Sequence, residues 1–186
     1  MTVQLLLRKA QKLEKSGDLV SALKVYGKVL KDFPGNRNAQ QSINRISNPP
    51  EVIIKQIITL LNRGEYKETI FESKQLLKKF PSSYLVYYFK GIATASMGEY
   101  SEAEKAFHKA VDLNPNFSDP YNNLGILLFE NDELDRCEIY FQKAIKLSPK
   151  NHEYYYNLAN TFMRKGENKK AIDLFLRAID LSPNYT

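Results

Sequence analysis

The sequence has little of what disulfide-bonded, metal-binding and membrane proteins require. Its 186 residues include one cysteine, two histidines and no tryptophan. A single cysteine, Cys137, cannot form an intrachain disulfide and leaves too few thiol and imidazole ligands for a structural zinc site. No stretch approaches the roughly 18 consecutive apolar residues of a membrane-spanning helix. We therefore expect no disulfide, metal or cofactor, no membrane insertion, and a location in the reducing cytoplasm.

Patterns that carry catalysis are also missing. The sequence contains no glycine-rich phosphate loop, no nucleophile–base pair and no metal-ligand spacing. We interpret His108 and His152 as packing or surface residues, and Cys137 as a small buried residue. An acidic cluster at 130–138 lacks the central glycine of a calcium-binding loop. We predict that the chain is not an enzyme and has neither catalytic nor metal-binding residues.

Positive charge is scarce outside the first quarter of the chain. The net charge is +6, but residues 1–49 hold nine basic and three acidic residues, and the remainder is balanced. A nucleic-acid-binding protein usually carries a basic stripe along its binding surface. Because the excess lies at one end here, we expect no nucleic-acid partner.

What the sequence has in quantity is internal repetition. Five prolines recur at intervals of 47, 34, 34 and 34, namely Pro34, Pro81, Pro115, Pro149 and Pro183. The same intervals separate five turn residues, namely Gly17, Gly64, Gly98, Asp132 and Gly166. Aromatic and small residues follow the same period in the last three units. The sequence therefore predicts five repeats, at 3–36, 50–83, 84–117, 118–151 and 152–185, with a short helical or linker insertion at 37–49.

Each unit has the pattern of two helices. In the fourth unit, apolar residues recur at helical spacing on both sides of Asp132, a residue type that tolerates a left-handed turn. Pro149 ends the second helix, because the residue before a proline is pushed out of helical conformation. Gly125 would let two helices approach while Tyr121 and Phe141 fill the space between neighbours. The predicted fold class is all-α, a right-handed α-solenoid of stacked antiparallel helix pairs.

The period and these residues resemble the tetratricopeptide repeat family. The last three units carry the resemblance best, in the segments YYFKG…FHKAVDLNP, YNNLG…FQKAIKLSP and YYNLA…FLRAIDLSP. The first two units depart from the pattern, since Ile57, Thr69 and Leu76 stand where small residues are expected. The resemblance implies a solenoid whose first helices line a concave groove and whose function is protein binding.

Two features interrupt the regular array. Within 37–49, Ala39, Ile43 and Ile46 would give a short helix one apolar face, and Pro49 would end it, so the first unit is expected to stack differently. After the fifth unit no polar capping helix follows, although terminal repeats normally need a polar outer face. We therefore expect either a longer protein or self-association at this end.

The candidate partner-binding groove is assigned by helical spacing on the first helices. Its residues are Tyr88, Ile92, Asn122, Asn123, Ile126, Phe129, Tyr156, Asn157, Asn160 and Met163. Asn123 and Asn157, one repeat period apart, would form a short ladder able to grip an extended peptide backbone, since an asparagine amide both donates and accepts hydrogen bonds. In the tyrosine run at 154–156, Tyr155 is expected to pack, Tyr156 to face the groove and Tyr154 to cover a joint.

These patterns favour a protein–protein interaction module that binds a peptide or partner segment in the groove. Two alternatives remain at this stage. One is a self-assembling structural scaffold that associates through the C-terminal repeat. The other is a repeat or targeting arm of a larger protein, in which a transferase domain would follow.

Overall fold

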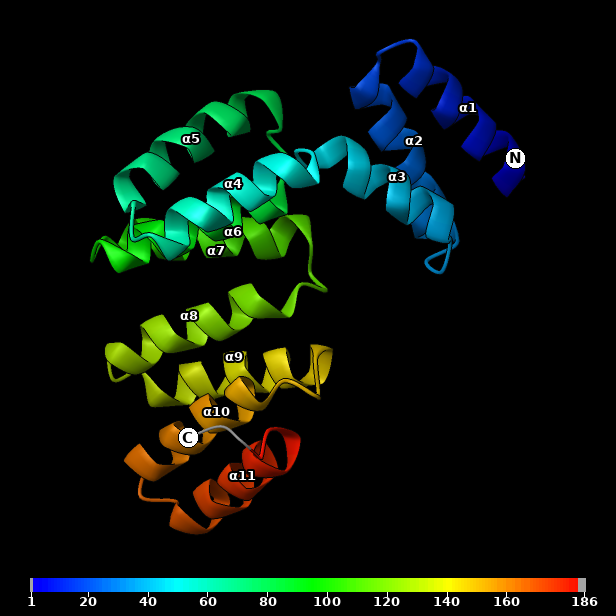
Figure 1. The fold of residues 1–186 in the computed structure, drawn as a ribbon. Coiled ribbons are helices and arrows are strands. Elements are labelled where there is room, and N and C mark those ends of the chain that lie inside the picture. Colours follow the sequence, from blue (N-terminus) through cyan, green and yellow to red (C-terminus); the bar gives the residue numbers. More distant parts are fainter. Residues whose placement is uncertain (1, 184–186) are drawn as a thin grey trace.

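The structure, a computed structural model, describes residues 2–183. Within this range it consists of eleven α-helices joined by short turns, with no β-strand (Figure 1). The helices are α1 (Val3–Lys15), α2 (Leu19–Asp32), α3 (Arg37–Ser47), α4 (Glu51–Asn62), α5 (Tyr66–Lys79), α6 (Tyr84–Ser96), α7 (Tyr100–Leu113), α8 (Ser118–Glu130), α9 (Leu134–Leu147), α10 (His152–Arg164) and α11 (Asn168–Leu181). The predicted all-α solenoid is confirmed. Residues 184 and 185, the end of the fifth predicted unit, lie outside the described residues.

The turn inside each helix pair contains one residue in left-handed conformation. It is Gly17, Gly64, Gly98 or Gly166 in four pairs, and Asp132, with φ of 63°, in the remaining pair. After Asp132, the N–H of Glu133 donates to the carbonyl of Leu128 at 2.9 Å, which satisfies one of the last carbonyls of α8. Aspartate is one of the few side chains that adopt this conformation readily. The turn predicted at this position is therefore confirmed.

Helices α4 to α11 form a continuous stack in which the second helix of each pair packs on the first helix of the next (Figure 1). The core between units is apolar, and Phe141 shares it with Leu158 and Phe162 of the following unit. Tyr121 and Phe141 are 8% and 1% exposed. The prediction that these two rings fill the space between helices is confirmed.

A close approach between glycine and phenylalanine joins the two helices of a unit. A Cβ atom added to Gly125 would lie 2.6 Å from the ring of Phe141, and one added to Gly91 would lie 2.5 Å from the ring of Phe107. Real Cβ atoms do not come so close to a ring carbon, so the ring occupies the space that a side chain would need.

In the second unit the large residue of this pair stands on the first helix and the small residue on the second helix. Ile57 stands one repeat period before Gly91, and Ser73 stands one period before Phe107. Both are buried. The departure of Ile57 from the repeat pattern is therefore offset by a small residue on the opposite helix, which keeps the combined volume within limits that a core tolerates.

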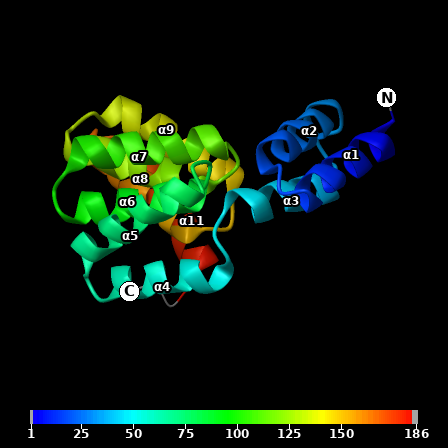
Figure 2. The ribbon, with the colours of Figure 1, turned by 90° about the horizontal axis from the view of Figure 1, so that it is seen from above.

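Helices α1–α3 extend to one side of the stack (Figure 2). Helix α3 packs against α2, and Ala39, Ile43 and Ile46 of α3 share a core with Leu30 of α2. Leu30 is equivalent by repeat position to Val111 and Ile145, which pack against the following unit in the stack. Helix α3 therefore covers the face of α2 on which a regular following helix would lie.

The two parts of the chain meet at the turn that follows α3. Pro49 and Pro50 separate α3 from α4, since proline cannot continue a helix. Beside them, the buried side-chain oxygen of Asn48 accepts a hydrogen bond from the Ser83 hydroxyl at 2.7 Å. This bond ties the junction to the start of α6.

We expect Gly125→Ile and Phe141→Ser each to destabilise the stack. The first overpacks the contact, at about 1–3 kcal/mol or more, and the second leaves a cavity, on the scale of about 3–5 kcal/mol for loss of a buried phenylalanine side chain. The double variant copies the arrangement of Ile57 and Ser73, so its loss is expected to fall about 0.5–3 kcal/mol short of the sum. Denaturant unfolding followed by circular dichroism measures all three. Strictly additive losses would contradict direct contact between the two positions.

Candidate binding groove

The candidate groove lies on three neighbouring first helices. Helix α6 supplies Tyr88 and Ile92, helix α8 supplies Asn122, Asn123, Ile126 and Phe129, and helix α10 supplies Tyr156, Asn157, Asn160 and Met163. Met163 and Tyr156 are exposed, Asn122 is buried, and the other seven are half-buried. The predicted residues thus form one row across three units, but they are not equally accessible.

The amide of Asn157, one member of the predicted ladder, is engaged within the protein. Its side-chain N–H donates to the side-chain oxygen of Asn122 at 2.8 Å. A second contact has the same step of 35 residues, since Arg164 donates to the carbonyl of Phe129 at 3.0 Å. Side chains on a helix lean toward its N-terminus, and successive first helices are offset, so cross-helix contacts join residues one position more than a full period apart.

Tyr88 anchors the end of the row on α6. Its ring lies 4.9 Å from that of Phe117 and 6.2 Å from that of Phe107, centroid to centroid. Burial, with a further contribution from the Asp119 carboxylate, raises the pKa of the Tyr88 hydroxyl, which also contacts the side chain of Asn123. The hydroxyl therefore stays protonated and keeps its donor at any physiological pH.

Tyr154 locks α10 to the start of α8. It is buried, its hydroxyl donates to the carboxylate of Asp119, and the Ser118 hydroxyl lies 3.0 Å away. Burial and, after it, this bond to Asp119 raise the pKa of the Tyr154 hydroxyl. Sequence reasoning missed the part that Asp119 plays, although its separation from Tyr154 along the chain is the same as for the other cross-helix contacts.

The other two tyrosines of the run point elsewhere. The hydroxyl of Tyr155 donates to the carbonyl of Pro149 at 3.1 Å, as the hydroxyl of Tyr121 does to the carbonyl of Pro115. Tyr156 is exposed, and its ring meets that of Phe175 edge-on at 5.6 Å. Of the three tyrosines, Tyr156 is exposed, Tyr155 is half-buried and Tyr154 is buried.

The end of the row near the turns carries a cation. The Arg164 guanidinium lies 4.9 Å from the centre of the Phe129 ring and its Nε is 3.0 Å from the Asp132 carboxylate. These contacts hold Arg164 over Phe129, whereas the neighbouring Met163 is exposed and Asn160 is half-buried. Asn160 has no hydrogen-bond partner for its side chain among residues 2–183.

Features outside the row have packing roles. Cys137 is buried, its sulfur lies 3.5 Å from the Thr161 hydroxyl, and burial raises the pKa of the thiol, which lowers its reactivity. His108 lies on α7, 6.2 Å from Tyr140, ring to ring. In the described part of the chain, no cluster of three or more histidine, cysteine or acidic residues is placed to hold a metal ion. No helix there is long and apolar enough to cross a membrane.

Comparison with known protein families fits this geometry. The family described as "Psidin, N-terminal TPR repeats region" matches residues 51–176, which run from α4 into α11. The chain belongs to the tetratricopeptide repeat (TPR) family. The match leaves out α1–α3, the part of this TPR protein that extends to one side of the stack.

Solved TPR structures share the fold over nearly the whole chain. A crystal structure of MamA is 24% identical with a TM-score of 0.64, and the match covers 94% of each chain. TTC0263, a thermophilic TPR protein of Thermus thermophilus, is 20% identical with a TM-score of 0.61, covering 98% of this chain and 93% of that one. YrrB, described as a TPR protein with an unusual peptide-binding site, is 20% identical with a TM-score of 0.60, covering 97% and 86%. None of the curated proteins matches the sequence.

We expect Tyr154→Phe to destabilise this TPR protein by about 1–3 kcal/mol, because it keeps the ring but removes a buried donor to a charged group. Tyr155→Phe is the matched control, since it removes a hydroxyl whose bond to Pro149 is exposed, and we expect a smaller loss. Urea unfolding of the two variants beside the wild type measures both. Equal losses would show that the contact with Asp119 does not hold α10 to α8.

Proposed function

We propose that this TPR protein binds an extended peptide or partner segment across α6, α8 and α10, and that it acts by binding and not by catalysis. The observation that carries the proposal is the row of side chains on these helices, in which Asn160 has no partner within residues 2–183 and lies beside the exposed Met163. We place this activity in the cytoplasm.

The row combines the two kinds of contact that an extended segment needs. The amide of Asn160 offers a donor and an acceptor, which can pair with a peptide backbone of any sequence. Ile92, Ile126 and Met163 offer apolar surface, and the flexible methionine adapts to differently shaped side chains. Backbone pairing with adaptable apolar contacts supports binding of a segment rather than of a small molecule.

Charge along the row favours a neutral or basic segment over an acidic one. Asp119 and Glu153 occupy positions at the start of α8 and α10, and Glu130 is exposed at the end of α8. The first carboxylate is already engaged by Tyr154, whereas Glu153 and Glu130 remain exposed. An acidic tail would meet these like charges, and Arg164 at the end near the turns is already paired with Asp132.

The peptide-binding site of YrrB supports a peptide as the ligand class, because the two chains share one fold. The sequence identity of 20% does not carry over any residue of that site. The assignment of Asn160 and Met163 rests on their accessibility in this structure.

Selection from a phage-displayed library of short random peptides against the immobilised full chain tests the proposal. We expect Asn160→Ala and Met163→Arg to weaken a selected peptide about tenfold, equivalent to about 1.4 kcal/mol for a lost hydrogen bond or apolar contact. Fluorescence anisotropy gives the affinities. Asn168→Ala and Ile139→Arg are matched controls, since both residues are exposed on second helices. Selected peptides that bind both groove variants as tightly as the wild type would place the site elsewhere.

A second candidate function, self-association through α11, rests on a separate observation. Ile172, Leu176 and Ile179 are 58%, 56% and 54% exposed and recur at i, i+4 and i+7, so they form one apolar stripe along the outer face of α11. Contiguous exposed apolar stripes mark interaction surfaces more often than ordinary surface does. We propose that this stripe contacts a second copy of the chain.

A further inference from the structure

Inside the stack, each first helix buries one face against the second helix of the preceding unit. The residues that do so stand at equivalent repeat positions, namely Val86 and Ala93 in α6, Pro120 and Leu127 in α8, and Tyr154 and Thr161 in α10, and all six are buried. Contacts between α9 and α10 show the packing directly, because Cys137 lies 3.5 Å from Thr161 and Glu138 pairs with Lys165 at 2.8 Å.

In α4 the same positions are uncovered. Val52 and Thr59 stand one repeat period before Val86 and Ala93, and both are exposed, Val52 by 61%. The cause is local: α3 occupies the outer face of α2, so no second helix lies in front of α4.

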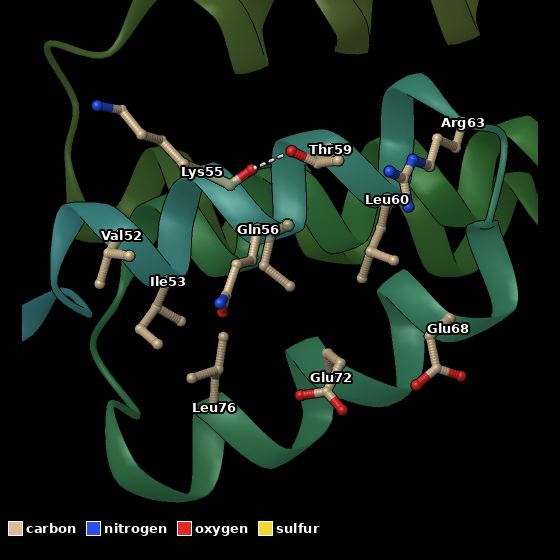
Figure 3. Close-up of a pocket in the computed structure, with 11 residues that line it drawn as sticks. Val52, Ile53, Lys55, Gln56, Thr59, Leu60, Arg63, Glu68, Glu72 and Leu76 are labelled. Atoms are coloured by element: carbon tan, nitrogen blue, oxygen red, sulfur yellow. Dashed lines mark hydrogen bonds between the residues drawn. The ribbon is translucent and has the colours of Figure 1, made fainter.

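The uncovered face is an open groove between α4 and α5. Its volume is about 540 Å³, and Val52, Ile53, Leu60 and Leu76 supply its apolar surface. Figure 3 shows Leu76 of α5 facing Ile53 and Gln56 of α4 across the groove. The stack thus begins with an uncovered face on α4, the helix on which a preceding second helix would pack, and with an open groove beside it.

Helix α11 presents the complementary face at the other end. Ile179 is equivalent to Val111 and Ile145, which pack against the next unit. Leu176 and Ile172 are equivalent to Gln142 and Glu138 of α9. Glu138 contacts the following unit through Lys165, whereas Gln142 stays exposed inside the stack. The contact face of α11 is therefore more apolar at Ile172, keeps an isoleucine at Ile179, and is covered by no helix within the described residues.

The described part of the chain offers one uncovered second helix, which we call the donor, and one suitable uncovered first helix, which we call the acceptor. Among the described second helices, α2, α5, α7 and α9 are each covered by the helix that follows, which leaves α11. Among the described first helices, α1 and α4 lack a preceding partner, and α1 carries Leu5 and Lys12 at the positions of Val52 and Thr59, with Lys9 between them. Lysines on such a face resemble the polar cap that an array end normally has. Helix α4 has the uncharged Gln56 and Thr59 in place of Lys9 and Lys12, although Lys55, Arg63, Glu68 and Glu72 also line its groove.

We propose that α11 of one copy docks in the groove between α4 and α5 of a second copy, so that the two stacks continue as one solenoid. This inference rests on the self-association candidate above and names its acceptor. The contact repeats the geometry of the internal interfaces, in which a second helix packs on the first helix of the next unit. It joins two different surfaces, so each added copy leaves one donor and one acceptor free, and assembly continues beyond the dimer.

The contact is mainly apolar. The ion pair between Glu138 and Lys165 has no counterpart in it, because Ile172 and Arg63 stand at the equivalent positions. Apolar burial is not screened by salt, whereas exposed ion pairs are. Added salt is therefore expected to leave the association unchanged or to strengthen it.

Two blocked variants of the full chain test the proposal. Ile179→Arg places a charge on the donor stripe, and Val52→Arg places one in the acceptor groove; both residues are exposed, so neither change disturbs the core. Sedimentation analysis at increasing concentration is expected to show growing mass for the wild type and a monomer for each variant alone. Mixed in equal amounts, the two variants are expected to form a one-to-one dimer and nothing larger, because one good donor and one good acceptor remain. Ile139→Arg, at an exposed apolar residue of α9, is the matched control and is expected to assemble as the wild type does.

Each other outcome overturns the inference in a distinguishable way. If Ile179→Arg abolishes association and Val52→Arg does not, α11 associates with itself or with another surface, so self-association stands and the acceptor is wrong. If both variants are monomers and their mixture stays monomeric, the two surfaces do not bind each other. If the wild type remains a monomer throughout, self-association fails with the inference, and peptide binding in the groove, measured separately, is unaffected.

Discussion

The fold depends on a phenylalanine ring pressed against a glycine on the facing helix. At Gly125 and Gly91 the ring occupies the place where a Cβ atom would stand, so the two helices of a unit approach more closely than side chains normally allow. The contact joins α6 to α7 and α8 to α9. Because the same pair recurs in consecutive units, small rotations add up to a continuous solenoid with one row of first helices.

That rotation also decides which side chains meet across the row. A strict sequence period suggests that equivalent residues of neighbouring units touch, but the contacts in the structure join residues one position further apart, as Asn122 and Asn157 do. The side chain of Asn122 therefore bonds α8 to α10 and is not available to a partner, whereas the side chain of Asn160 has no hydrogen-bond partner among the described residues. The surface available to a partner is therefore what the cross-helix contacts do not use.

Periodicity was enough to predict the helix pairs, their turns and the buried rings, because those features repeat within each unit and have local causes. Asp132 shows this well, since its place in the period required a left-handed turn and the structure has one. The contact between Asn122 and Asn157 could not be predicted in the same way, because it depends on how neighbouring units are offset, which no single unit encodes. The open face of α4 was also beyond the pattern, because it depends on which helix covers α2.

The insertion at 37–49 has a structural effect out of proportion to its length. Without it, the outer face of α2 would pack on α4 and the array would have one beginning, at the polar face of α1. Helix α3 lies there instead and ends at Pro49 and Pro50, so both α1 and α4 lack a preceding second helix. The exposed face of α4 therefore keeps apolar residues that an interior unit would bury. A single short helix thus turns an internal packing face into an external one, and it does so without changing any residue of the stack itself.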